Sequence, residues 1–264
     1  MRQDLSLEAL CRRMGGWVEW NHVKSMAEST LQPKGAMAEL LGQFGRALSA
    51  SDNDNWPFEV HMSGESSAAW LLGHLISRIT LPKAEGGLGR TVASATLCAP
   101  TVTMDFFQRK IMPPLRAGAL GRLSLVTLDA QAEAHDGFGG LYHGSLLQLI
   151  SNALEDRLRI PPEPSGTPMA GITAHIQQDE EWAGLVAQWS GKPQPRAEHI
   201  VLSRGDFDAS RGSLHGRLLS GTNRMHNLLD RVLNADVSVQ IGEARLAGGL
   251  DEPQQDGSPA VPDA

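Results

Sequence analysis

The spacing of hydrophobic side chains divides the chain into two parts. Over residues 4–48, apolar residues such as Trp17 and Trp20 recur at the spacing of a helix, and Pro33 and Gly35 interrupt them, which predicts two helices. In the second part, short apolar runs typical of strands alternate with stretches of helical spacing. This pattern predicts strands over 58–63, 91–98, 123–128 and 200–203, and helices over 67–79, 103–112, 145–157 and 222–234.

Strands that alternate with helices favour the α/β class, with a mostly parallel sheet and helices on both faces. Little strand pattern precedes residue 57. We therefore expect a reduced or N-terminally truncated sheet, with the strand at 58–63 central and the later strands to one side of it. One edge of that strand is then left unpaired, which favours self-association.

Three regions follow from this organisation. We expect an N-terminal helical segment over residues 1–48 and an α/β core over 57–247. The last stretch, 248–264, is polar and rich in Pro and Gly, a composition typical of a disordered tail.

Composition and charge narrow the range of partners. The formal net charge is −7, whereas a protein that binds nucleic acid needs a clustered basic surface. No window of about 18 apolar residues occurs, so no membrane span is expected. The first residues lack the apolar stretch of a signal peptide, and a cytoplasmic location is expected. The chain has two cysteines and neither CxxC nor HExxH spacing, so no metal or other cofactor is predicted.

The sharpest chemical signal lies in the segment FEVHMSGESSAAWLLGHLI. A predicted strand runs into Gly64-Glu65-Ser66-Ser67-Ala68 and directly out into a predicted helix. A nucleophile elbow has this form, because its serine sits on a strained turn that small residues two positions before and after make possible. The alternative is that Ser66 only caps the helix. In an elbow, the backbone N–H of Ser67 faces the developing oxyanion at the positive end of the helix.

The order of candidate residues along the chain supports the elbow. In α/β-hydrolases the nucleophile comes first, then an acid, then a histidine. Here an acidic loop with Asp129, Glu133 and Asp136 follows the second predicted strand after Ser66. His215 lies after the third such strand and just before a predicted helix. Each group therefore follows the carboxyl end of a strand, where open α/β sheets bind their ligands.

The chain resembles a family of α/β-hydrolases, mostly bacterial, over residues 17–235. The resemblance rests on VHMSGESSAAWLLGHLI, LCAPTVTMDFF, EAHDGFGGLYHGSLLQLISNALED and SLHGRLLSGTNRM. It implies that Ser66 is the nucleophile and His215 the base. It implies an acid at Asp136, preferred for its place before Tyr142, or at Glu133 as the alternative.

Two features depart from the family. Its elbow is usually Gly-His-Ser-Ala-Gly, whereas Glu65 stands beside the nucleophile here, and a carboxylate at that place disfavours an anionic intermediate. The strands that precede the nucleophile in the family, and the loop there that supplies a second oxyanion donor, have no counterpart in the pattern of this sequence.

We expect a serine hydrolase, esterase- or lipase-like, that acts on a small-molecule ester or acyl substrate. Two alternatives stay open: a catalytically impaired hydrolase-like scaffold that binds a partner, and an acyltransferase on the same fold. Three other histidines, His61, His74 and His135, are interpreted as packing or solvated residues.

Overall fold

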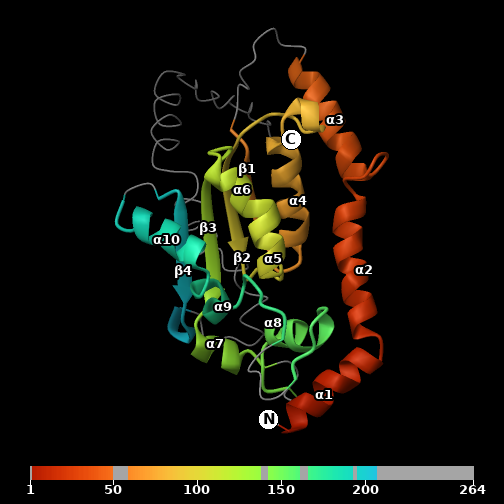
Figure 1. Cartoon of the computed structure of the whole chain (residues 1–264), viewed down its shortest axis with the longest axis vertical. Helices are drawn as coiled ribbons and strands as arrows, with labels where there is room; N and C mark the ends of the chain where they lie inside the picture. The colour runs from red at the N-terminus through yellow and green to blue at the C-terminus, as the bar shows by residue number, and fades with distance from the viewer. Residues whose placement is uncertain (1, 50–58, 138–141, 161–165, 193–194, 207–264) are drawn as a thin grey trace, which may run out of the picture.

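The computed structural model describes residues 2–49, 59–137, 142–160, 166–192 and 195–206. Figure 1 shows the elements in their chain order: α1 (Arg2–Arg13), α2 (Gly16–Ser29), α3 (Ala36–Ser49), β1 (His61–Glu65), α4 (Ala68–Thr80), η1 (Lys83–Glu85), β2 (Val92–Cys98), α5 (Met104–Phe106), η2 (Phe107–Ile111), α6 (Met112–Arg116), β3 (Leu120–Leu128), α7 (Ala130–His135), α8 (Leu146–Leu149), η3 (Ile150–Leu154), α9 (Thr173–Gln177), α10 (Glu180–Trp189), β4 (Ala197–Leu202) and η4 (Arg204–Asp206).

The four strands form one sheet in the order β1-β2-β3-β4, and every pair is parallel. The α/β class and the placement of the later strands on one side of the first are therefore confirmed. Among the described residues β1 is an edge strand, so the expectation that it is central is wrong for this part of the chain. Glu65 is in register with Cys98, and Cys98 with Val126, so the strands end close to one another at the carboxyl edge of the sheet.

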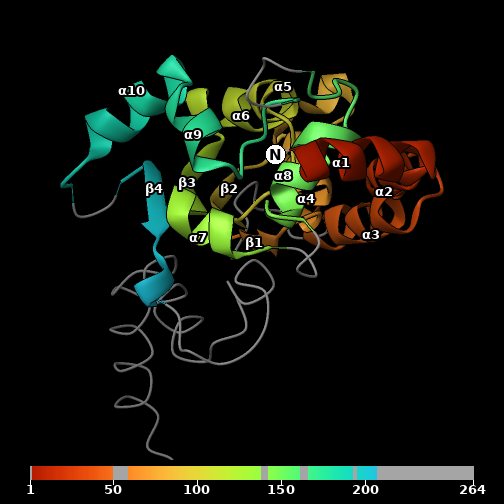
Figure 2. The ribbon, with the colours of Figure 1, turned by 90° about the horizontal axis from the view of Figure 1, so that it is seen from below.

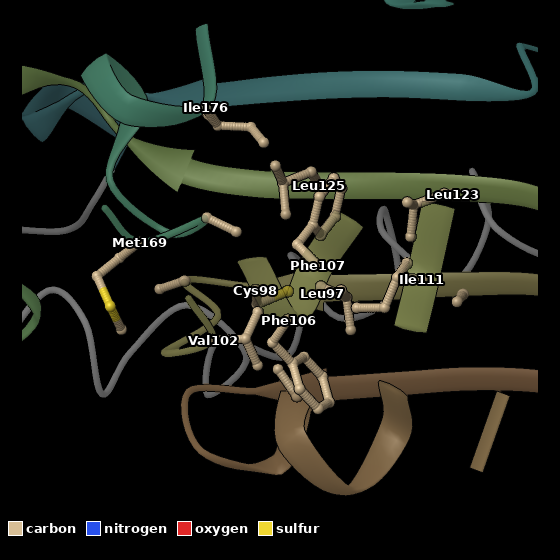
Figure 3. Packing of buried hydrophobic residues seen from close by; sticks show 14 of the residues in the cluster. Leu97, Cys98, Val102, Phe106, Phe107, Ile111, Leu123, Leu125, Met169 and Ile176 are labelled. Atoms are coloured by element: carbon tan, nitrogen blue, oxygen red, sulfur yellow. The ribbon is translucent and has the colours of Figure 1, made fainter. Parts of the chain in front are cut away.

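The hydrophobic core lies between the sheet and the helices α4, α6 and α10, which contact β1, β3 and β4 respectively. Leu97, Leu123 and Leu125 project from the strands toward Phe107 and Ile111, and all five are fully buried (Figure 3). Burying a side chain of this size contributes about 1.5–3 kcal/mol. Figure 2 shows α6 and α10 on the same side of the strands. The expected helix over 222–234 lies outside the described residues.

The first two helices are attached to this core. Helix α1 packs against η3, and α2 packs against both α4 and η3. The Trp20 indole donates a hydrogen bond of 2.6 Å to the Glu155 carboxylate, and the Lys24 ammonium lies 2.8 Å from the other Glu155 oxygen. Because Glu155 is buried, these two donors compensate the loss of its hydration.

The N-terminal region contains one more break than the sequence pattern predicts. Gly15 has φ 91°, a left-handed conformation that glycine adopts without steric cost. It separates α1 from α2, so residues 2–49 contain three helices instead of the predicted two.

Several predicted boundaries shift in the structure. Strand β1 lies three residues later at its start than the predicted 58–63, and β3 starts at Leu120 rather than 123. The predicted helix over 103–112 continues to Arg116 through the π-helical η2, and the one over 145–157 ends at Leu154. The predicted acidic loop contains the helix α7. None of the helices within the described ranges combines the length and the hydrophobicity that crossing a membrane requires.

Candidate active site

Ser66 lies in the two-residue turn between β1 and α4 and has φ 55°. Such a backbone angle is unfavourable for a residue with a side chain and persists only where surrounding contacts enforce it. The Ser66 N–H donates to the carbonyl of Cys98 at 2.9 Å, and its carbonyl accepts from the N–H of Thr101 at 3.2 Å. The turn is therefore fixed to the carboxyl end of the neighbouring strand β2.

The expected strand–turn–helix context of Ser66 is confirmed, and the alternative that Ser66 caps the helix is not what the structure shows. The N-cap of α4 is Ser67, whose side chain makes no capping hydrogen bond. At a helix start the first N–H groups have no acceptor within the helix. The backbone N–H of Ser67 belongs to this group, which suits the oxyanion-binding role that the sequence predicts for it.

Gly64 allows the strand and the helix to approach each other. A Cβ atom at Gly64 would lie 2.5 Å from Cδ1 of Leu72 and 3.4 Å from Cβ of Ala68. The first distance is far below van der Waals contact, and the second is ordinary contact. A larger residue two positions before Ser66 would therefore force the Leu72 side chain to move, and glycine avoids this contact.

Glu65 and Cys98 are neighbours in the sheet register. Burial raises the pKa of the Cys98 thiol to about 12, and the Glu65 carboxylate adds to the effect. Cys98 is therefore an uncharged, buried thiol, as the apolar run around it suggests. Gly64 faces α4, and because alternate residues point to opposite faces, Glu65 faces the other side of the sheet.

Two of the acidic residues after β3 stand at the two ends of α7. Asp129 is the N-cap of α7 and accepts a hydrogen bond of 2.6 Å from the N–H of Ala132. This bond engages its carboxylate in starting the helix. Asp136 is buried and ends α7, where its N–H donates to the carbonyls of Ala132 and Glu133.

Glu133 is the most perturbed acid of the group. Burial raises its pKa to about 7; a hydrogen bond with Ser145 opposes this rise, and the nearby charge of Asp136 adds to it. Its oxygen Oε2 is buried, and the described residues provide no hydrogen-bond partner for it. A buried carboxylate oxygen without a hydrogen-bond partner destabilises the folded chain. Groups with strongly perturbed pKa values are concentrated in functional sites.

The structure brings Ser66 and the two candidate acids to the same edge of the sheet. Ser66 follows the last residue of β1, and α7 begins two residues after the last residue of β3. The strands are parallel neighbours of β2, so these groups follow carboxyl ends that are two strand spacings apart, about 10 Å. The proposed base, His215, lies outside the described residues.

The three histidines that the sequence suggests as packing or solvated residues have local partners. His61 binds Ser94 at 2.8 Å and Glu59 at 3.2 Å from the start of β1, at the opposite end of the strand from Ser66. His74 packs edge-on against Phe106, and burial lowers its pKa. The ring of His135 interacts with the carbonyl one turn earlier in α7.

A cluster of polar groups that the sequence does not predict lies beyond the same edge of the sheet. The buried Glu8 carboxylate accepts from Tyr142, Asn152 and Arg159. His175, on α9, accepts the N–H of Met169. These contacts join residues up to 151 positions apart, and no local pattern in the sequence signals them.

Comparison of the chain with protein-family models, with curated proteins and with solved structures gave no match.

Proposed function

We propose that this protein is a serine hydrolase of the α/β-hydrolase type that cleaves a small carboxylic ester. The observation that carries the proposal is the conformation of Ser66, a serine at φ 55° between a parallel strand and the helix that follows it. The nucleophile of α/β-hydrolases occupies such a strained turn. Gly64, two residues before Ser66, lets β1 and α4 approach closely, and the residue two positions after Ser66 is the small Ala68.

The proposed reaction uses the side chains in the order of a serine triad. His215 takes the proton of the Ser66 hydroxyl while the Ser66 oxygen attacks the ester carbonyl, and the Ser67 N–H binds the resulting oxyanion. The alcohol leaves with the proton carried by His215, and an acyl group stays on Ser66. Water then attacks this acyl-enzyme in the same way and releases the acid.

For the acid we now favour Glu133 over Asp136. A triad acid needs a carboxylate oxygen that can accept from the imidazole, and Oε2 of Glu133 has no other partner in the described part of the chain. Ser145 holds the Glu133 side chain by a hydrogen bond. Asp136 stays the alternative, because it is also buried at the end of the same helix.

The proposal is tested with a chromogenic ester of a short fatty acid. Ser66→Ala is expected to lower kcat/KM by about 10³-fold or more, since the nucleophile is lost while substrate binding persists. Ser63→Ala is the matched control, because Ser63 is an exposed serine on the strand that leads to Ser66. Equal activity of the two variants would refute the role of Ser66. Adding an alcohol as acceptor separates hydrolysis from acyl transfer.

The scaffold alternative has one observation in its favour. Among the described residues β1 has a single neighbour, β2, and the complete sheet of the family continues beyond the nucleophile strand. A folded chain that neither cleaves esters nor reacts with a serine-directed probe would support it. Self-association through the β1 edge stays a prediction.

A further inference from the structure

A polar cavity of about 500 Å³ lies beyond the carboxyl end of the sheet. Residues of α1, α8, η3 and α9 contribute to its wall, and Figure 1 shows α1 and α8 below the strand ends. Ile172, in its wall, forms a parallel bridge with Leu128, the last residue of β3. Cavities of this volume hold small molecules, and open α/β sheets bind ligands at this edge. Ser66 is not part of the wall.

The carboxylates near the cavity are engaged by the protein itself. Glu8 accepts from the hydroxyl of Tyr142 at 2.7 Å and from Nε and Nη2 of Arg159 at 3.1 and 2.7 Å. Asp4, in the wall, accepts from the backbone N–H and the ring Nδ1 of His143 at 3.2 and 2.9 Å. The charges of these two acids are therefore largely compensated by groups of the wall.

Three nitrogen donors on half-buried side chains of the wall have no acceptor among the described residues. Nδ1 of His175 accepts the N–H of Met169 at 3.1 Å, which places the ring proton on Nε2. Burial lowers the pKa of His175 and keeps the ring neutral. Oε1 of Gln148 accepts the N–H of Ser145, which leaves its amide NH₂. Arg159 uses Nε and Nη2 for Glu8, which leaves Nη1. Within the described residues none of these three nitrogens donates to an acceptor.

We propose that the cavity binds a small molecule through an oxyanion, a carboxylate or a phosphate group, held by Arg159, His175 and Gln148. A guanidinium edge with two neutral N–H donors is the complement of such a group. Their own hydrogen bonds to Glu8, Met169 and Ser145 orient the three donors before a ligand arrives, which lowers the entropic cost of binding. This site does not depend on the proposed chemistry of Ser66.

The decisive variant is Gln148→Glu. Glutamate retains the side-chain oxygen that accepts from the Ser145 N–H, and Ser-x-x-Glu is itself a helix capping box, so α8 is expected to stay capped. The substitution replaces the amide donor by a negative charge that faces the oxyanion. Gln177→Glu is the matched control, because Gln177 is exposed on α9 and outside the wall. His175→Asn is a second probe that keeps an acceptor for Met169 and removes the Nε2 donor.

Binding is measured by isothermal titration calorimetry on the full chain, with inorganic phosphate and with succinate at constant ionic strength. We expect saturable binding of at least one probe with a Kd of about 1 mM or lower. Gln148→Glu is expected to weaken it about tenfold or more, which corresponds to the loss of one charge-assisted contact. Gln177→Glu is expected to bind like the wild type, and so is Ser66→Ala. Preference for one probe identifies the oxyanion as phosphate or carboxylate.

Two results would overturn the inference: neither probe binds saturably, or Gln148→Glu and Gln177→Glu bind the better probe equally well. His175→Asn is the second test, because it introduces no charge that could disturb folding. It removes the Nε2 donor and must therefore also weaken binding of the probe. Failure of Ser66→Ala to affect binding separates this site from the proposed hydrolase, so either proposal can fail while the other stands.

Discussion

At the scale of single residues, two side chains of the candidate site are held in states that oppose folding. Ser66 has a backbone angle of φ 55°, and Glu133 is a carboxyl whose pKa is raised to about 7 by burial. Each state costs free energy that the surrounding packing must offset. Lys34 and Ala99 also have positive φ angles, so strain alone does not mark a site. Strained backbones and perturbed carboxyls are enriched at functional sites, and Ser66 and Glu133 also follow strand ends at the same edge of the sheet, which is the reason for assigning both to the proposed triad.

The first prediction separates the two candidate acids. We expect Glu133→Gln to lower kcat for ester hydrolysis by about 10³–10⁴-fold, because the imidazole of His215 loses the group that holds its tautomer. Asp136→Asn keeps the side-chain shape at the end of α7 and is expected to retain most activity. The measurement is steady-state hydrolysis of a chromogenic ester by both variants. The opposite ranking would assign the acid to Asp136.

The second prediction concerns the pH dependence of stability. The pKa of Glu133 is about 7 in the folded chain and 4.5 as a free group, so the folded chain binds this proton more tightly. Its contribution therefore favours folding below pH 4.5 and is lost as the pH rises from 4.5 through 7. Glu133→Gln removes this titration and is expected to raise the free energy of unfolding at pH 8 by about 1–3 kcal/mol.

Urea unfolding at pH 4 and pH 8 measures this effect. The stability difference between Glu133→Gln and the wild type is expected to be small at pH 4 and to appear at pH 8. Glu85→Gln, exposed at the end of η1, is expected to change the free energy of unfolding by less than about 0.5 kcal/mol at both pH values. A destabilised Glu133→Gln at pH 8 would show that partners of the carboxylate, the proposed His215 among them, stabilise it by more than burial destabilises it.

At the scale of elements, the turn between β1 and α4 depends on contact between two close backbones. We predict that Gly64→Ala destabilises the chain by about 1–3 kcal/mol, because the new Cβ would lie 2.5 Å from Cδ1 of Leu72 and that side chain would have to move. The double variant, Gly64→Ala with Leu72→Ala, removes the Leu72 Cδ1 atom with which the new Cβ would clash. Its free energy of unfolding, measured in urea, is expected to be higher than the sum of the two single effects predicts. If the two effects on the free energy of unfolding simply add, residues other than Leu72 relieve the clash, and the predicted contact is wrong.

The elements also show what the sequence could and could not predict. The sequence predicts β2 to within one residue, because its apolar run is continuous and it is buried on both faces. The pattern predicts β1 three residues too early, since its residues HMSGE lack an apolar alternation. It predicts a loop where α7 forms, although Asp129 provides a capping residue before that helix. Polar residues in β1 and α7, the strand and the helix nearest to the candidate site, thus hide the apolar patterns by which such elements are predicted.

At the scale of the whole molecule, contacts distant in sequence hold the N-terminal helices to the core. Glu155 joins α2 to the end of η3 through Trp20 and Lys24, 135 and 131 positions away. The Ser66 turn could be predicted because its signal is local. The Glu155 contacts and the polar cavity could not, because each member alone is an ordinary polar residue of a helix or loop.

The fourth prediction tests this attachment. Glu155→Ala leaves the buried indole N–H of Trp20 without an acceptor and the Lys24 charge without its counter-ion. The expected cost is about 1–3 kcal/mol, localised to the N-terminal helices. In hydrogen–deuterium exchange, amides of α2 are expected to exchange about tenfold faster or more, while those of β2 and β3 keep their protection. Glu19→Ala, exposed on the same helix, is the control and is expected to leave exchange unchanged.

The central claim is that Ser66 is a reactive nucleophile, and covalent labelling tests it most directly. The full chain is treated with a fluorophosphonate, and the modified peptide is located by mass spectrometry. We predict one adduct on Ser66, absent in Ser66→Ala and present in Ser63→Ala, because only a serine activated by a neighbouring base reacts in this way. A chain that stays unlabelled, or a label that persists in Ser66→Ala, would contradict the account.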